Sequence, residues 1–175
     1  VVRIGDLCVP GASLRTRQWE SFLVPAIEAE LGARLGRGIE GRRDSDDDVA
    51  WMGAIEALAA GIELHHYQWI GGGPSSQELI ASNAIHAGVV HGEWVEPAGI
   101  DLALEGVGAW VNKELRASGI GAEVLGQGPL SSLRWLASEA RRRETPLMAG
   151  DLVILGSAVP LIRVEAGDEV VARFT

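Results

Sequence analysis

An alternating stretch of apolar and polar residues constrains the fold of this chain more than any other feature. Residues 24–35 carry apolar side chains at every second position, and Glu28, Glu30, Gly32 and Arg34 lie between them. Because side chains alternate across a strand, the pattern predicts a β-strand with two glutamates side by side on one face. Such carboxylates repel each other unless water or a cation lies between them. A divalent metal site and a solvated outer face of an edge strand both fit this stretch alone.

Length and composition are typical of one domain with a sizeable core. The chain has 175 residues, of which 47% are hydrophobic, and its 23 glycines indicate a strand-rich fold with many turns. The net charge of −9 argues against a nucleic-acid-binding surface and against contact with an anionic membrane. The single cysteine, Cys8, excludes an internal disulfide, so a cytoplasmic location is expected. No apolar run reaches the length of a transmembrane helix.

Three helices are expected. Ser45 and Asp48 resemble a capping box, which predicts a helix over residues 46–60 that Gly61 ends. The acidic run 44–48 would also suit a metal loop, but carboxylates in a first turn favour the helix start. Capping and apolar spacing predict two more helices, over residues 75–83 and 130–143.

Most of the remaining chain has the pattern of strands and turns. Residues 61–69 alternate, so that Glu63 and His65 share one face of a strand and His66 lies on the other. Further strands are expected over residues 85–95, 101–111, 114 onward, 151–157, 161–164 and 169–174. These expectations together predict an α+β fold with a β-rich core and about three flanking helices.

Glu28, Glu30 and Glu63 would form an oxygen-rich site if their two strands were neighbours. Spacing alone leaves that pairing open. His65 is either a proton carrier beside these glutamates or a hydrogen-bonded structural histidine. His86 and the nearby His91 have no acidic neighbour at metal-ligand spacing in the sequence, and we interpret both as structural or surface residues.

Five segments also carry a resemblance to a known family, in the same order over nearly all of the chain. They are residues 25–31 with 35–37; 62–64; 81–84; 118–126 continuing through 129 to 135–137; and 149–157 with 164–168. They resemble the fumarylacetoacetate hydrolase superfamily and, within it, the 2-keto-4-pentenoate hydratase and 4-oxalocrotonate decarboxylase group. The resemblance implies a mixed β-roll core in a single catalytic-type domain, residues 1–175, that lacks the family's N-terminal portion.

The resemblance also implies a metal centre and a substrate pocket. Glu28, Glu30 and Glu63 match the positions that bind a divalent ion in these proteins, usually Mg²⁺ or Mn²⁺. Four residues match positions that line or lie near the substrate pocket: Gly156, Ser157, Asn83 and Gln127. The implied partner is a small 2-oxo acid, and a homo-oligomer is expected.

The implied reaction is the addition of water to a small unsaturated 2-oxo acid, with the metal stabilising an enolate. Decarboxylation, hydrolysis of an acylpyruvate and a catalytically inactive relative are the alternatives. Hydratases of this type carry a lysine in the N-terminal portion, and no residue here matches it. His66 and Gln68 stand where Asp and Arg are usual, and Ser82 replaces an Asp. These departures lie close to the predicted site, where altered neighbours retune a metal centre.

Overall fold

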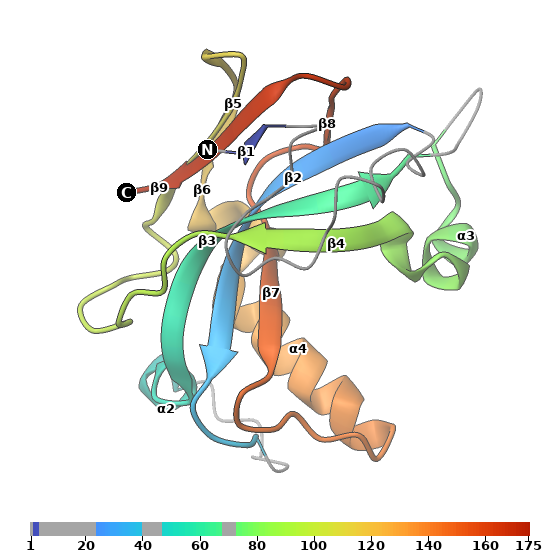
Figure 1. Cartoon of the computed structure of the whole chain (residues 1–175). Coiled ribbons are helices and arrows are strands. Elements are labelled where there is room, and N and C mark those ends of the chain that lie inside the picture. The colour runs from blue at the N-terminus through green and yellow to red at the C-terminus, as the bar shows by residue number, and fades with distance from the viewer. Residues whose placement is uncertain (1, 4–23, 40–46, 68–72) are drawn as a thin grey trace.

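Two antiparallel sheets dominate the computed structural model, which describes residues 2–3, 24–39, 47–67 and 73–175 (Figure 1). The smaller sheet has the order β1 (Val2–Arg3), β9 (Glu169–Phe174), β5 (Gly106–Val111), β6 (Glu114–Ile120). The larger sheet has the order β4 (His86–His91), β3 (Ile55–His66), β2 (Pro25–Leu35), β7 (Leu152–Ser157), and β8 (Ile162–Arg163) also pairs with β2. The long strands β2 and β3 therefore form the centre of the larger sheet.

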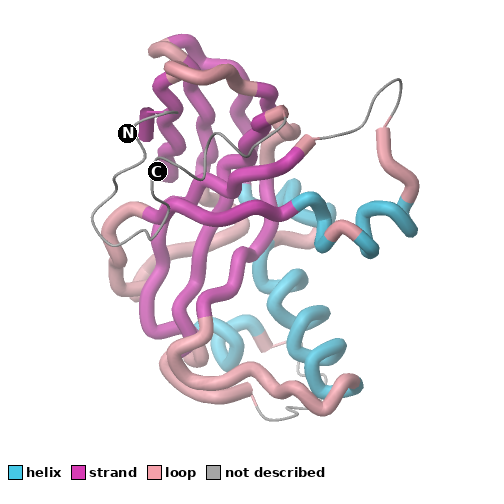
Figure 2. Tube along the Cα trace, turned by 45° about the vertical axis from the view of Figure 1, so that its right-hand side comes forward, coloured by secondary structure: helices cyan, strands magenta, loops and turns pink. Residues whose placement is uncertain are grey.

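The described residues also form three α-helices and two short 3₁₀ helices. They are α2 (Asp48–Met52), α3 (Ser76–Ala81), α4 (Pro129–Arg142), η1 (Asn83–Ile85) and η2 (Gly121–Gly126). Figure 2 shows α4 running beside the larger sheet, where it contacts β7. None of the helices in this part of the chain is long and apolar enough to cross a membrane. The strand-rich α+β architecture with three helices confirms the fold class predicted from the sequence.

The odd-numbered residues of β2 build both hydrophobic cores. Toward one end of the strand, Ile27 packs in a cluster with Val107 and Val170 of the smaller sheet. Toward the other end, Leu35 packs in a cluster with Leu133 of α4. The period-two pattern of the sequence is confirmed, and the even-numbered residues of β2 consequently occupy the opposite face of the sheet.

The helix predicted over residues 46–60 is wrong for most of its length. Only α2 forms, where the Asp47 side chain accepts a hydrogen bond from the Val49 N–H (3.1 Å) and Gly53 ends the helix. From Ile55 the chain is already in β3, antiparallel to β2. Alanine and leucine favour helices in isolation, but a long partner strand overrides that preference. Gly61 is accordingly an interior residue of a strand, and Ser45 lies outside the described residues.

The other boundaries differ less from expectation. The capping box of α3 is present, since Ser75 and Glu78 bond each other's backbone N–H. Helix α4 begins one residue before its predicted start. The strand expected from residue 101 begins only at Gly106, because the Asp101 carboxylate accepts the N–H of Ala103 (3.0 Å) and holds a turn there.

Gly121 occupies a position where no side chain fits, because a Cβ there would overlap the carbonyl oxygen of Leu102. We expect Gly121→Ala to lower the free energy of unfolding by about 1–3 kcal/mol, the usual cost of overpacking. A Cβ at Gly73 meets no atom within 4 Å, so Gly73→Ala should stay within about 0.5 kcal/mol of the parent. Urea unfolding measures both, and equal midpoints for the two variants would contradict the prediction.

Candidate metal centre

The register of β2 and β3 brings the three predicted glutamates onto one face of the larger sheet. Glu28 lies directly opposite Glu63, and Glu30 lies opposite Gly61. Opposed residues of an antiparallel pair project to the same side. Because Gly61 has no side chain, the space above the sheet beside the Glu30 side chain is not filled from β3. The strand pairing that the sequence left open is therefore present, and it is the one that a shared site requires.

Two of the glutamates form a tight group with His65. Ligand atoms of Glu28, Glu63 and His65 all lie within 4.8 Å of one another. His65 Nε2 is 3.0 Å from Glu28 Oε2 and 3.8 Å from Glu63 Oε2. His86, which has no acidic neighbour at metal-ligand spacing in the sequence, finds one across the sheet, since its Nδ1 lies 2.6 Å from Glu63 Oε1. Glu30 stands one register step along β2, outside this tight group.

Glu30 is a buried carboxyl group, with only 3% of its surface exposed. Its pKa is raised from 4.5 to about 9, mainly by burial and also by the charges of Glu63 and Glu28, while a hydrogen bond from the Gly156 N–H opposes the rise. Its Oε2 has no hydrogen-bond partner among the described residues. A carboxyl group in this position needs either a proton or a cation, and three carboxylates are what a hard divalent ion prefers. The residues present therefore fit the ion that the resemblance implies.

The residues of the predicted Gly156–Ser157 loop lie beside Glu30, with Ser157 opposite it in the pairing of β2 with β7. Gly156 has φ +108°, and a Cβ there would lie 2.7 Å from Val124 Cγ1, so only glycine fits. The Ser157 hydroxyl lies 3.0 Å from the Ala29 carbonyl and 2.8 Å from the Val159 carbonyl. The Gly156 N–H is thus directed at Glu30, and the Ser157 hydroxyl is directed at backbone carbonyl groups. The substrate contacts predicted for Gly156 and Ser157 stay a prediction.

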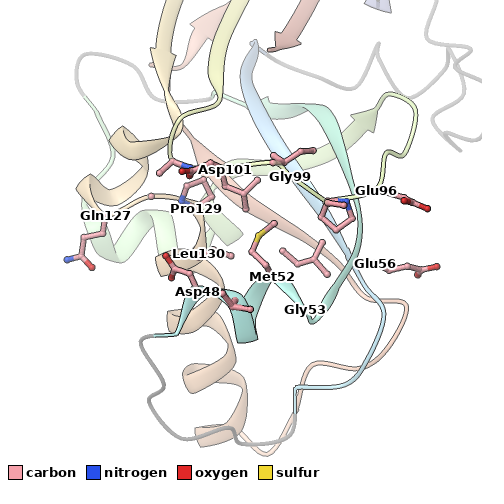
Figure 3. A pocket seen from close by; sticks show the side chains of 18 residues that line it. Asp48, Met52, Gly53, Glu56, Glu96, Gly99, Asp101, Gln127, Pro129 and Leu130 are labelled. Atoms are coloured by element: carbon pink, nitrogen blue, oxygen red, sulfur yellow. The ribbon is translucent and has the colours of Figure 1, made fainter.

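The structure does not bring Asn83 and Gln127 together with the glutamates in one cavity. Asn83 is exposed in η1, three residues before His86. Gln127 lines a cavity of about 700 Å³ between α2, residues 96–103 and the start of α4, and none of the three glutamates lines it. In Figure 3 the side chain of Gln127 lies at the rim of this cavity and points outward.

Trp94, which the sequence pattern did not single out, and His91 border the glutamate face. A Cβ at Gly32 would lie 4.0 Å from Cη2 of Trp94, so the indole covers the position next to Glu30 on β2. The ring of His91 lies 4.8 Å from that of Trp94, and the guanidinium of Arg34 lies over the indole at 5.1 Å. Trp94 lies in the loop after β4, so no periodicity in the sequence indicates that it borders the site.

Comparison with known proteins identifies relatives by sequence, although no family model matches the chain. It is 30% identical over 145 residues to 2-keto-4-pentenoate hydratase from Paraburkholderia xenovorans (strain LB400), a match that covers 82% of this chain and 53% of that protein. It is 29% identical over 148 residues to 2-hydroxyhexa-2,4-dienoate hydratase from Comamonas testosteroni, covering 84% and 55%. The chain thus spans about half the length of the curated relatives it matches.

Solved structures share the fold. The TM-score is 0.79 with 4-oxalocrotonate decarboxylase from Pseudomonas putida G7, complexed with magnesium and adipate, at 24% identity over 89% of this chain and 58% of that chain. It is 0.60 with fumarylpyruvate hydrolase from Pseudomonas aeruginosa, in complex with Mn²⁺ and pyruvate, at 15% identity over 87% and 62%. At these identities the likeness concerns the fold alone, and it agrees with the architecture described above.

In the metal-free protein, we expect Glu30→Gln to flatten the pH dependence of stability. The pKa of Glu30 is raised from 4.5 to about 9, so the folded state holds a proton that the unfolded chain releases. The corresponding stability is complete below about pH 4.5 and is lost as the pH rises through about 9. Glutamine stays neutral throughout. The variant should therefore gain stability over the parent as the pH rises.

Urea unfolding in the presence of a chelator, at about pH 6 and about pH 9, measures this gain. The matched control is Glu114→Gln, at an exposed carboxylate on β6, which should follow the parent at both pH values. Parallel pH profiles for Glu30→Gln and the parent would show that the buried carboxyl does not resist ionisation.

Proposed function

Since the chain belongs to the fumarylacetoacetate hydrolase superfamily, we propose that it is a divalent-metal-dependent hydro-lyase that adds water to a small unsaturated 2-oxo acid. The observation that carries this proposal is the convergence of Glu28, Glu30 and Glu63 on one sheet face, with Glu30 buried and its Oε2 without a hydrogen bond from any described residue. The sequence relatives named as hydratases support this choice of reaction.

Glu28, Glu30 and Glu63 would hold the ion, for which Mg²⁺ and Mn²⁺ are the first candidates because both prefer carboxylate oxygen. When bound, such an ion supplies a Lewis acid for the keto group of a 2-oxo acid. Two hydrogen bonds aim the ligands. His86 holds one oxygen of Glu63, and the N–H of Gly156 donates to Glu30. Fixed carboxylates of this kind lose little freedom on binding a ligand.

The chain also offers groups that border a substrate on the same face. Trp94 covers Gly32 beside Glu30 and would exclude water there. His91 Nδ1 lies 2.9 Å from the Gly92 carbonyl, which places the proton on Nδ1 and leaves Nε2 with a lone pair. Addition of water requires a group that takes a proton from water and a group that returns one to carbon. His91 Nε2 is a candidate for the first step, together with His65 as predicted from the sequence.

The reaction is tested by product analysis. With 2-oxopent-4-enoate and Mg²⁺ or Mn²⁺, we expect a product that has gained one water and kept every carbon. Glu28→Gln and Glu63→Gln should each lower turnover by about 100-fold or more, because both remove a carboxylate ligand. The exposed Glu114→Gln variant is the control and should keep full turnover.

Other substrates would identify the alternatives. Release of CO₂ from an unsaturated 2-oxo diacid indicates a decarboxylase, and cleavage of an acylpyruvate by water into two organic acids indicates a hydrolase. Absence of turnover together with absence of metal binding would overturn the proposal and leave a catalytically inactive relative.

We further propose that the protein acts as a homo-oligomer in the cytoplasm. Several large apolar side chains are exposed on the described surface, among them Leu125 at 72% and Trp135 at 65%, and such groups favour association. Light scattering coupled to size exclusion should give a mass that is a multiple of 18.5 kDa. A single species at the monomer mass, at micromolar concentration, would contradict this expectation.

A further inference from the structure

The cavity between α2, residues 96–103 and the start of α4, which we call the α2 cavity, has the size of a small-molecule site. Its volume is about 700 Å³, and pockets that bind small molecules commonly measure about 300–1,000 Å³. None of the three glutamates of the candidate metal centre lines it, so the two sites are separate.

The interior of the α2 cavity is apolar. Buried side chains of β3, of the loop 96–103 and of α4 form its wall, namely Ile55, Leu102, Pro129 and Leu130. In Figure 3 the side chain of Met52, from α2, lies in the middle of these lining residues. An apolar group placed against them would remove hydrocarbon surface from water on both sides, which favours binding.

Four carboxylates stand around this apolar interior. They are Asp48, Glu56, Glu96 and Asp101. In Figure 3, Glu56 and Glu96 lie on one side of the cavity, and Asp48 and Asp101 lie on the other. Arginines from outside the lining pair with Asp48 and Glu56, whereas no cation in the described part of the chain pairs with Glu96 or Asp101. Two of the four negative charges are therefore left uncompensated.

The negative charge continues beyond the rim of the α2 cavity. An adjoining hollow of about 230 Å³ shares Ile100 with it and is bordered by Glu93 and Glu105. The pKa of Glu105 lies above its usual value, first because of desolvation and then because of the charge of Asp101. None of the described residues that line either hollow is a lysine, an arginine or a histidine. Charges of one sign on apolar walls concentrate their field in the space between the walls, which attracts the opposite charge.

We propose that the α2 cavity binds a small organic cation, an amine with an apolar body. The ammonium group faces Glu96 and Asp101, and the body packs against Met52 and Leu130. A bare metal ion would leave the apolar interior in contact with water, and an organic anion would meet four carboxylates. The inference does not depend on the proposed function, because the α2 cavity shares no residue with the glutamate face.

The two methionines of the chain provide a test that requires no variant of the site. Met52 lines the α2 cavity, and Met148 does not. In protein labelled with ¹³C at the methionine methyl groups, titration with 4-phenylbutylamine should shift the Met52 signal and leave the Met148 signal in place. The probe 4-phenylbutanoate has the same ring and a chain of similar length but a negative charge, and it should bind about 10-fold more weakly or less. Equal affinities for the two probes, or a Met52 signal that does not move at millimolar amine, would overturn the proposal.

A double variant tests the two unpaired charges. Glu96→Gln combined with Asp101→Asn removes both, and asparagine keeps an acceptor for the Ala103 N–H. The double variant should weaken amine binding by about 3- to 10-fold, since each exposed charge contributes modestly. Glu28→Gln is the control for the glutamate face, which also attracts cations, and it should leave amine binding unchanged. Amine binding that is weakened by Glu28→Gln, or unchanged in the double variant, would overturn the proposal.

Discussion

The pairing of β2 with β3 is the interaction on which the rest of the structure depends. Its register sets Glu28 against Glu63, and the same register directs the apolar residues of both strands into the two cores. A slip of one residue would exchange the two faces and expose the core side chains. Exposing the core side chains would cost free energy, and this cost keeps Glu28 and Glu63 side by side although their negative charges repel each other.

The glutamate face combines groups that a metal-free protein tolerates poorly. Within the described ranges, one oxygen of the buried Glu30 carboxyl has no hydrogen bond, and the buried imidazole of His65 lies beside two further carboxylates without a hydrogen bond of good geometry. Such arrangements are costly and are typical of functional sites. The hydrogen bonds that do exist, from Gly156 to Glu30 and between His86 and Glu63, fix the orientation of individual oxygens. The two hydrophobic cores stabilise the fold, whereas the glutamate face of the larger sheet holds groups suited to binding a ligand.

Sequence reasoning succeeds where the signal is local and fails where it depends on pairing. The alternation of residues 24–35 predicts the two faces of β2 correctly, because side-chain direction in a strand follows from position alone. The start of β3 could not be predicted, since its alanines and leucines are compatible with a helix until β2 is present. The contact of His86 with Glu63 also escapes prediction, because it depends on a register shift between β3 and β4. Trp94 borders the site through a loop, for which no periodicity exists.

The face that carries the glutamates has a consequence for how the molecule comes apart. An ion held by residues of both β2 and β3 would bridge the two central strands at mid-length, between the region that packs on the smaller sheet and the region that packs on α4. Neither end of the sheet could then fray far without first releasing the ion. The bound ion would cross-link the two central strands. Its loss would let the two ends of the sheet unfold locally and become accessible to proteases before either core unfolds.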